Sequence, residues 1–407
     1  MALIKKKIKI ATILPYKENY TFKKASAASL WVSEFFKNSK FKNSNDIYGH
    51  TKNSDYLTKN YINIELRNIK SRFKSVTNEY LKKLIKKFQI KKYDIIEIHN
   101  RPLILEGLYK KISSRYIMYF HNDPLSMNGS KTIKERLNII SNVEKIIFVS
   151  EWTQKRFFID IDDKLKTKTE IIYPSVNIKK KISKKKNYIT FIGKLNESKG
   201  YDLYCKSMFK ILDEYNEWCA ISIGEERRFQ NFPTHKRHFN LGQIPHNKVL
   251  DYLSKSEIAV IPSRWEEPFG RTALEASSRG CATIISNTGG LPETTDYAIK
   301  LKKLDTKNIE NEIIKLIRND KLRKRIQIKS KNFVKHKLKR NSKKIDFMRN
   351  SLFPFKKINI NGNKLRIINI YNLAQKLNHR IYNLSLGKKF TNGFIRNGHD
   401  VIEISDR

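Results

Sequence analysis

Residues 258–286 read IAVIPSRWEEPFGRTALEASSRGCATIIS, and this stretch decides the fold. The apolar run Ile258–Pro262 has the length of a buried strand, and a second such run covers Cys281–Ser286. Between them, a loop leads into a segment with helical periodicity that starts near Phe269. Strand, helix and strand in this order predict a β-α-β unit whose two strands lie parallel in one sheet.

The same alternation extends along the chain in both directions. We expect an α/β fold class with two Rossmann-like, doubly wound domains of residues 1–178 and 187–350 that face a cleft. The lysine-rich residues 179–186 between them are predicted to be a solvated linker. The further predicted strands are Lys7–Leu14, Tyr93–Ile98, Tyr116–Phe120, Lys145–Val149, Glu170–Tyr173, Tyr188–Ile192 and Trp218–Ile223, and helices are predicted at Lys24–Phe36 and from Ile309 to about Asn350.

Residues 358–407 form a third segment. A strand at Leu365–Tyr371, a helix at Lys388–Asn397 and a strand at Asp400–Ile404 predict a partial β-α-β unit. Its opening, NKLRIINIYNL, resembles the KKIKIATILPY near the N-terminus. We expect the start of a further domain of the same kind, with a docked C-terminal appendage as the alternative.

Composition excludes several classes of protein. The chain has 407 residues, of which 39% are hydrophobic and 11% aromatic, which is enough for sizeable cores and argues against disorder. Its three cysteines, Cys205, Cys219 and Cys281, form no CxxC pair, so a disulfide scaffold and a cysteine zinc site are excluded. No apolar run reaches the roughly 20 residues that span a bilayer, and lysines interrupt the N-terminal apolar stretch. We expect a soluble protein of the cytoplasm.

The net charge is strongly positive. Lys and Arg number 83 against 39 acidic residues, which gives a formal charge of +44. Such a charge is typical of nucleic-acid and polyanion binders, and this remains an alternative. However, the charge is spread along the whole chain, and lysine exceeds arginine, the residue that makes forked contacts with phosphates and bases. We therefore expect no specific nucleic-acid partner, and attraction to an anionic substrate or an anionic membrane surface instead.

Two carboxylates mark a binding site in the opening stretch. Glu267 precedes the predicted helix and Glu275 lies inside it, eight residues further on. Each carboxylate can accept paired hydrogen bonds from vicinal hydroxyls, which suits a ligand with a sugar and a ribose joined by a diphosphate. Between them, the backbone N–H groups of Phe269, Gly270 and Arg271 are expected at the N-terminus of a helix, where anionic oxygens bind.

A second loop supplies positive charge. The strand Tyr188–Ile192 runs into GKLNESKG, residues 193–200, and then into a helix. Gly193, Lys194 and Lys199 in this setting predict a phosphate cradle, although the spacing of a P-loop is absent. The lysines would neutralise a diphosphate and stabilise the charge that develops on it as a leaving group.

These motifs together resemble a known family. EPFGxxxxE, the upstream GKLxxxKG, LGQIPHNKVLDYLSKSEIAVIPS and GGLPE are similar to the donor-binding domain of family-four retaining glycosyltransferases of GT-B fold. In the first half, YDIIEIHNRP, YFHNDP, FVSEW and IIYPSVN resemble the strand-end loops of the partner domain, so the resemblance covers about residues 6–350.

The resemblance implies roles for single residues. Glu267 would contact the donor sugar, Glu275 the ribose, and Lys194 with Lys199 the diphosphate, while His121 would line the sugar site. It further implies a hexosyltransferase that retains the anomeric configuration and needs neither a cofactor nor a metal. We expect Glu267, His121 and Lys199 to be catalytic, and the acceptor side to be formed by Pro15, Tyr16, His99 and Asn122.

The sequence departs from the family pattern at two loops. Lys194 stands where an arginine is usual, so a forked phosphate contact is lost. Residues 15–19, PYKEN, replace a glycine pair after the first strand, which changes the contacts with donor and acceptor.

His99 and His121 end two strands, at the edge where ligands bind in open α/β sheets. The pattern Asp160-Ile161-Asp162 is interpreted as a turn and not as a metal site, and Cys281 as a packing residue.

The sequence therefore predicts an enzyme that takes a sugar from a nucleotide-diphosphate sugar. Its expected acceptor is a glycan or lipid-linked molecule in surface polysaccharide or glycoconjugate synthesis, at the inner face of a membrane. One alternative is a catalytically degenerate GT-B protein that binds a nucleotide sugar or glycan, which the missing glycine pair favours and the intact glutamates oppose.

Overall fold

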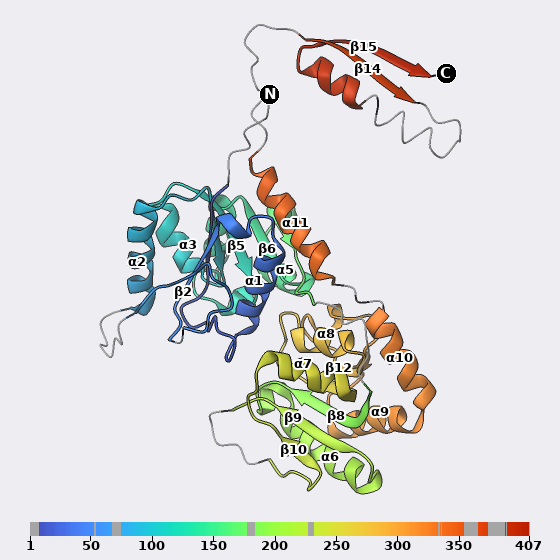
Figure 1. Ribbon diagram of the computed structural model, residues 1–407. Coiled ribbons are helices and arrows are strands. Elements are labelled where there is room, and N and C mark those ends of the chain that lie inside the picture. The colour runs from blue at the N-terminus through green and yellow to red at the C-terminus, as the bar shows by residue number, and fades with distance from the viewer. Residues whose placement is uncertain are drawn as a thin grey trace. The chain divides into compact units, whose positions relative to one another are not determined.

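The computed structural model describes residues 8–52, 54–66, 75–176, 184–226, 232–332, 334, 336–353, 365–372, 387 and 389–406. Residues 1–349 form one compact unit and residues 350–407 another. The first unit contains two α/β domains, each built on its own parallel sheet (Figure 1). The predicted fold class is confirmed.

The first domain is built on a seven-stranded sheet of order β3-β2-β1-β4-β5-β6-β7. All neighbours are parallel, and β1 pairs with both β2 and β4, so the strand order reverses at β1. The strands are β1 (Ile10–Ile13), β2 (Asn45–Gly49), β3 (Tyr61–Asn63), β4 (Ile95–His99), β5 (Arg115–Phe120), β6 (Lys145–Phe148) and β7 (Thr169–Ile171). The helices are α1 (Ala27–Asn38), α2 (Val76–Ile90), α3 (Pro102–Tyr109), α4 (Ile133–Asn142) and α5 (Glu151–Phe157).

The second domain repeats this plan with six parallel strands in the order β10-β9-β8-β11-β12-β13. Here the order reverses at β8, which pairs with β9 and β11. The strands are β8 (Lys186–Ile192), β9 (Cys219–Ile223), β10 (His238–Asn240), β11 (Ser256–Ile261), β12 (Ala282–Ser286) and β13 (Ile299–Leu301). The helices are α6 (Tyr201–Glu214), α7 (His246–Lys255), α8 (Arg271–Ser278), α9 (Thr306–Arg318) and α10 (Asp320–Asn332).

Apolar strands buried on both faces hold each domain together. In β1, β4 and β12 every residue is buried. Cys281 belongs to a buried cluster with Leu253 and Ile285, so its interpretation as a packing residue is confirmed. Sequence patterns do not predict β2, β3, β10 or β13, because each of these strands contains at most two apolar residues and forms no apolar run of strand length.

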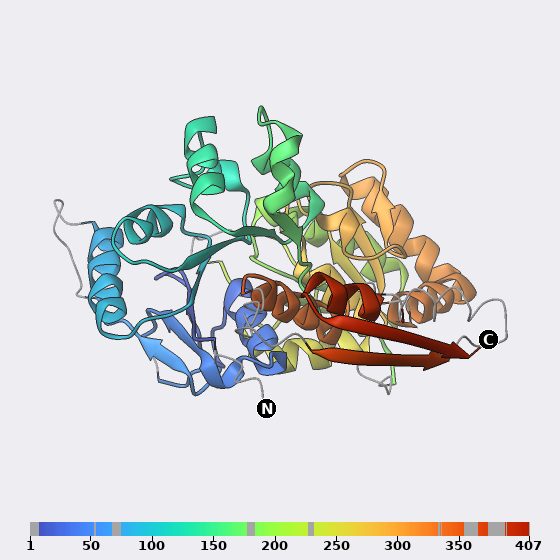
Figure 2. The same ribbon diagram turned by 90° about the horizontal axis from the view of Figure 1, so that it is seen from above.

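Helix α11 (Leu338–Ser351) joins the two domains. It follows the second domain in sequence but lies beside α1 of the first, as Figures 1 and 2 both show. Arg349 donates to both oxygens of the buried Glu97, over 2.8 and 2.7 Å. Asp346 accepts from the Ser39 hydroxyl at 2.6 Å and from the Lys40 N–H at 2.8 Å. The lysine-rich region expected in the second domain therefore also contributes a helix to the first.

A second set of contacts lies directly between the domains. Glu293 accepts from the N–H groups of Glu151 and Trp152, at 2.7 and 2.9 Å, at the start of α5. Phe269 is buried in an apolar cluster with Val149 and Leu274. These contacts bring the carboxyl ends of the two sheets toward each other.

The predicted linker is only partly described. Lys185 is not solvated as predicted. Its ammonium group donates to the carbonyls of Ser256 and Arg279 at 2.7 and 3.1 Å. Lys186 already begins β8. The prediction of a solvated connector is therefore wrong for Lys185, and residues 179–183 lie outside the described residues.

The unit of residues 350–407 contains a β-α-β segment. Strands β14 (Arg366–Asn372) and β15 (Asp400–Asp406) are parallel, with Ile368 beside Ile402. Residues 389–396 are helical, and the Asn369 amide donates to the Thr391 hydroxyl at 2.9 Å. Throughout the described residues, no helix combines the length and the apolar character needed to cross a bilayer.

Candidate functional site

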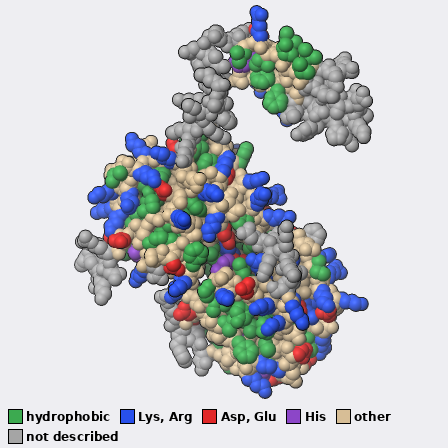
Figure 3. All heavy atoms as spheres, in the orientation of Figure 1, with side chains coloured by type: hydrophobic (Ala, Val, Ile, Leu, Met, Phe, Trp, Pro, Cys, Tyr) green, Lys and Arg blue, Asp and Glu red, His purple; other side chains and the backbone are tan. Residues whose placement is uncertain are grey.

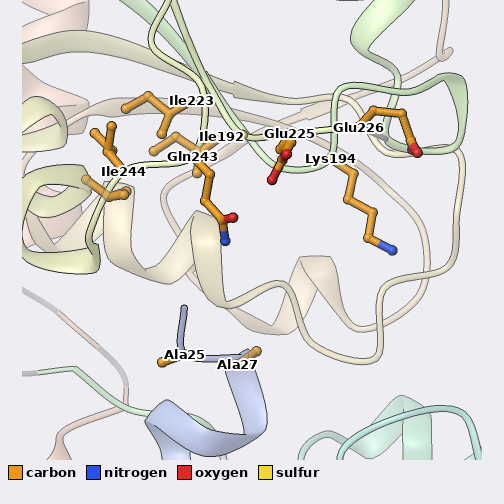
Figure 4. A pocket seen from close by; sticks show the side chains of 12 residues that line it. Ala25, Ala27, Ile192, Lys194, Ile223, Glu225, Glu226, Gln243 and Ile244 are labelled. Carbon is orange, nitrogen blue, oxygen red and sulfur yellow. The ribbon is translucent and has the colours of Figure 1, made fainter. Parts of the chain in front are cut away.

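The candidate site lies where the two domains adjoin, and Figure 3 shows histidine and acidic side chains gathered there. A cavity of about 730 Å³ opens in this region. The second domain contributes most of its lining, and Ala25 and Ala27 of the first domain lie across from it (Figure 4). The lining includes Ile192, Gly193 and Lys194 at the end of β8, Ile223, Gly224 and Glu225 at the end of β9, and Gln243 and Ile244 before α7.

The sequence predicts Gly193 and Lys194 as part of a phosphate cradle, and both residues line this cavity. It did not predict that the loops after β9 and before α7 also line the cavity. A signal was present, because Gly224 directly follows the predicted strand Trp218–Ile223. Figure 4 shows the side chains of Gln243 and Lys194 pointing toward the side of the cavity where Ala25 and Ala27 lie, with Glu225 between them.

A tight backbone contact brings Lys199 to the glutamate loop. Gly200 has φ +71°, and a Cβ there would lie 1.9 Å from the carbonyl oxygen of Pro262. Only glycine permits this approach. The Ser198 carbonyl then accepts from the N–H groups of Arg264 and Trp265 at 3.0 and 2.9 Å. The lysine loop and the glutamate loop are thereby held together.

Lys199 and Glu267 form an ion pair at the centre of this contact. The Lys199 ammonium lies 2.5 Å from Glu267 Oε1 and 4.0 Å from the centroid of the Trp265 ring. Burial lowers the pKa of Lys199, and the Glu267 carboxylate opposes this shift. Glu267 Oε2 makes no hydrogen bond to any described residue, so this oxygen is available to a ligand.

Glu275 is anchored in the same way. Its Oε1 accepts from His246 Nε2 at 2.9 Å and from Arg271 Nε at 2.6 Å. Burial alone would raise the pKa of Glu275, but Arg271 and His246 outweigh it and lower the pKa to about 2. Oε2 again has no hydrogen-bond partner within the described part of the chain. Both carboxylates thus have one oxygen fixed by hydrogen bonds and one oxygen free of partners among the described residues.

Helix α8 begins between the two carboxylates. It starts at Arg271, two residues after Phe269 and so close to the predicted start, with Gly270 as its N-cap at φ +90°. The N–H groups of Phe269, Gly270 and Arg271 donate no hydrogen bond to other described residues, so they can bind an anion at this helix N-terminus. The Phe269 side chain packs in the apolar cluster between the domains and contributes only its backbone.

The first domain contributes a histidine pair at the ends of β4 and β5. His99 Nδ1 lies 2.7 Å from His121 Nε2, and Trp31 packs edge-on against His121. Asn100, with φ 51°, accepts from the N–H groups of His121 and Asn122 at 2.7 and 3.2 Å. Burial lowers the pKa of His99 to about 3, with a further effect of Arg349, and burial also lowers the pKa of His121. Both imidazoles are therefore neutral at physiological pH.

Pro15 and Tyr16 follow β1, beside the end of β4. Pro15 is buried and Asn122 is exposed. The Tyr16 ring lies 5.0 Å from the Arg101 guanidinium and 6.1 Å from the centroid of the Tyr80 ring. Among the described residues, no hydrogen bond or ring contact joins Pro15 or Tyr16 to the histidine pair. The structure thus unites the predicted residues in local groups: Lys199 with Glu267, Arg271 with Glu275, and His99 with His121.

The Asp160–Asp162 segment takes no part in the site. Asp162 accepts from the Lys164 N–H at 2.9 Å and caps a short 3-10 helix, as expected of a turn. Among the described residues, no group of three or more His, Cys, Asp or Glu side chains is arranged to hold a metal ion.

Comparisons with known proteins identify the second domain. Residues 175–333 match the family described as "Glycosyl transferases group 1". The "Putative glycosyltransferase YtcC" of Bacillus subtilis (strain 168) is 25% identical over 272 residues, which is 58% of this chain and 66% of that protein. The "Phosphatidylinositol N-acetylglucosaminyltransferase GPI3 subunit" of Saccharomyces cerevisiae (strain YJM789) is 30% identical over 161 residues, 37% of this chain and 35% of that protein. The chain thus spans two thirds or less of these relatives' length.

Solved structures identify the arrangement of both domains. Sucrose-phosphate synthase from Thermosynechococcus elongatus superposes with a TM-score of 0.69 at 15% identity and covers 85% of this chain and 99% of its own. Anabaena Alr3699/HepE in complex with UDP-glucose superposes with a TM-score of 0.67 at 14% identity and covers 84% and 100%. The fold is GT-B, and residues 175–333 match group 1 glycosyltransferases, so the resemblance found in the sequence is confirmed at this level.

Proposed function

We propose that the protein is a glycosyltransferase that moves a hexosyl group from a nucleotide-diphosphate sugar to a glycan or lipid-linked acceptor, with retention of configuration. The observation that carries the proposal is the pair of half-anchored carboxylates, Glu267 and Glu275, on either side of the free N-terminus of α8. Two hydrogen-bond acceptors flanking an anion-binding helix end match the chemistry of a ligand with hydroxyls at both ends and a diphosphate between.

The proposed donor fills the cavity and the edge of the second sheet. Its base occupies the 730 Å³ cavity between Ile192, Ile223 and Ile244, and Gln243 offers both a donor and an acceptor. The ribose binds Glu275 Oε2, the diphosphate lies between Lys194 and the N-terminus of α8, and the sugar binds Glu267 Oε2. The comparison structure of Anabaena Alr3699/HepE holds UDP-glucose, which supports a nucleotide-sugar donor for this fold.

The proposed reaction breaks the bond between the sugar C1 and the β-phosphate oxygen. Lys199, Lys194 and the α8 N–H groups stabilise the negative charge that grows on the diphosphate, the role that a metal ion has in other transferases. The acceptor oxygen forms the new bond to C1 on the same face, and its proton goes to the departing phosphate. Lys199 holds the Glu267 carboxylate in an ion pair, which suits a sugar-binding role better than covalent attack.

The acceptor is proposed to enter against the first domain. Pro15 and Tyr16 follow β1, His99 ends β4, and the partly exposed His121 and the exposed Asn122 follow β5. An anionic membrane surface is a fitting source of a lipid-linked acceptor, because Leu103, Ile133 and Leu137 are exposed on α3 and α4 beside the exposed Lys131 and Lys134. Surface polysaccharide or glycoconjugate synthesis is the proposed setting.

A donor panel tests the proposal. Wild type is mixed with UDP-, GDP-, ADP- and dTDP-sugars, and release of the nucleoside diphosphate is followed beside Glu275→Ala and Lys199→Ala. Turnover of one donor that both substitutions abolish would support the transferase and name the nucleotide. Binding without turnover, in the presence of candidate acceptors, would favour a degenerate sugar-nucleotide binder. If no donor bound and polyanions bound in a salt-sensitive way, the protein would be interpreted as a polyanion binder and not as a transferase.

A further inference from the structure

Arg271 connects carboxylates from both domains. Its Nε donates to Glu275 Oε1 at 2.6 Å, within α8 of the second domain. Its two Nη groups donate to Glu34, on α1 of the first domain, at 2.9 and 2.6 Å. Figure 1 shows α1 and α8 on the facing sides of the two domains.

All three nitrogen atoms of the Arg271 guanidinium donate hydrogen bonds to carboxylates in this arrangement. The Arg271 side chain is 11% exposed and those of Glu34 and Glu275 are 22% and 7% exposed, so the three charges are largely removed from water. The two Nη groups of Arg271 form a forked, two-bond contact with the Glu34 carboxylate. Glu275 receives only Nε, through one oxygen, and keeps Oε2 free.

The spacing of Arg271 and Glu275 indicates what loss of the Glu34 contact would do. Arg271 and Glu275 are four residues apart on one helix, a spacing at which arginine and carboxylate side chains pair directly. A guanidinium released from Glu34 can turn its fork onto Glu275 and engage both oxygens. The free oxygen of Glu275 therefore depends on a residue of the other domain.

We infer that Glu34 is a positioning residue for the donor site: by holding the Nη edge of Arg271, it leaves Glu275 Oε2 open to the ribose only while the two domains are closed. The inference rests on the proposed function in one respect, namely that Glu275 binds the ribose. It makes donor binding and domain closure mutually dependent, so each favours the other to the same extent.

Calorimetric binding of UDP, GDP, ADP and dTDP to the full chain tests the inference. For whichever nucleotide binds wild type, Glu34→Gln is expected to raise Kd about tenfold, a common size for such coupling. The matched control is Glu106→Gln, which changes an exposed acid of α3 that pairs with Lys110, and its Kd should equal that of wild type. Equal Kd values for wild type and Glu34→Gln would overturn the inference.

A second variant separates positioning from a general loss of structure. If the released Arg271 blocks Glu275, then Arg271→Gln added to Glu34→Gln should recover part of the lost affinity, whereas damage to the fold would make the double variant worse. Recovery supports the inference, and additive loss contradicts it.

A measurement without nucleotide distinguishes the two proposals. Amide hydrogen exchange in the first turn of α8 and the C-terminal half of α1 should be faster in Glu34→Gln than in wild type. Unchanged exchange would contradict the role of Glu34 in holding the domains. If wild type bound no nucleotide while exchange still rose, the proposed function and the ribose role would fall, and only the contact between the domains would stand.

Discussion

His99 Nδ1 lies 2.7 Å from His121 Nε2, so a single proton is shared between two neutral imidazoles. Whichever ring donates it sets the tautomer of the other. His99 is 1% exposed and its Nε2 has no partner among the described residues, whereas His121 is partly exposed at the junction of the domains. The buried histidine therefore orients the one that can reach a ligand.

Replacing His99 should affect catalysis more than nucleotide binding. His99→Phe keeps the stacking with Tyr119 but removes the hydrogen bond to His121, and we expect turnover to fall about tenfold to a hundredfold. His99→Asn, whose amide can replace Nδ1, should retain more activity. Steady-state kinetics with the preferred donor would check this, and a larger loss in His99→Asn than in His99→Phe would contradict it.

The same pair predicts how stability depends on pH. The unfolded histidines bind a proton near their usual pKa of about 6.5, whereas burial holds the pKa of folded His99 at about 3. The unfolded state then binds more protons, so the free energy of unfolding is greatest above pH 6.5 and falls as the pH drops below it. The slope should approach about 1.4 kcal/mol per pH unit for each such histidine.

Urea unfolding at about pH 7 and about pH 5 measures this dependence. His99→Phe should lose less stability between the two pH values than wild type does. An equal loss in both proteins would show that other groups cause the acid sensitivity.

Removing Lys199 should reduce turnover strongly. Lys199→Met leaves the Glu267 carboxylate without its 2.5 Å ion pair and removes a charge from the diphosphate site, so we expect a loss of about 10²- to 10³-fold in turnover. The exposed Lys194 is the matched comparison, and Lys194→Met should cost less. Release of nucleoside diphosphate measures both, and a greater loss at Lys194 would reverse the assigned roles.

The ion pair between Arg349 and Glu97 should be essential for stability. Arg349→Met leaves a 1%-exposed carboxylate without its partner, and breaking a buried pair in this way costs about 3–5 kcal/mol. Arg340→Met, on an exposed position of the same helix, serves as the control and should change stability little. Urea unfolding compares them, and similar values for both variants would contradict the prediction.

Membrane attraction should depend on the exposed face of α4. Leu137→Asp places a negative charge beside Lys134, and we expect several-fold weaker binding to vesicles that contain anionic lipid. The control is Ile90→Asp, which changes the last residue of α2, and Ile90 is 82% exposed. Flotation assays that show equal binding for the two variants, or none for wild type, would remove α4 from the proposed acceptor route.

The sequence predicts the fold well because its information is local. Continuous apolar runs such as Tyr116–Phe120 specify buried parallel strands without reference to the rest of the chain. The positions of Glu267 and Glu275 around a helix start are likewise encoded within ten residues. The exact start of α8 was harder to predict from the sequence, since it depends on the αL conformation of Gly270, which packs against Leu291.

The partners of these residues could not be predicted, because they come from distant segments. Glu34 is 237 residues from Arg271 in the chain, and His246 is 29 residues from Glu275. Nothing in the helix containing Glu34 distinguishes it from a solvated surface acid. For the same reason Lys185 was expected in solvent, although the carbonyls that it binds belong to residues 71 and 94 positions away.

The return of α11 to the first domain bears on any attempt to prepare the domains separately. A fragment that ends at the linker would include Glu97 but lack Arg349 and Asp346, and it would expose the surface that α11 covers. The first domain is therefore complete only after translation has passed the second domain and reached residue 349. A fragment of the first domain should fold best when a peptide of residues 338–351 is supplied in trans.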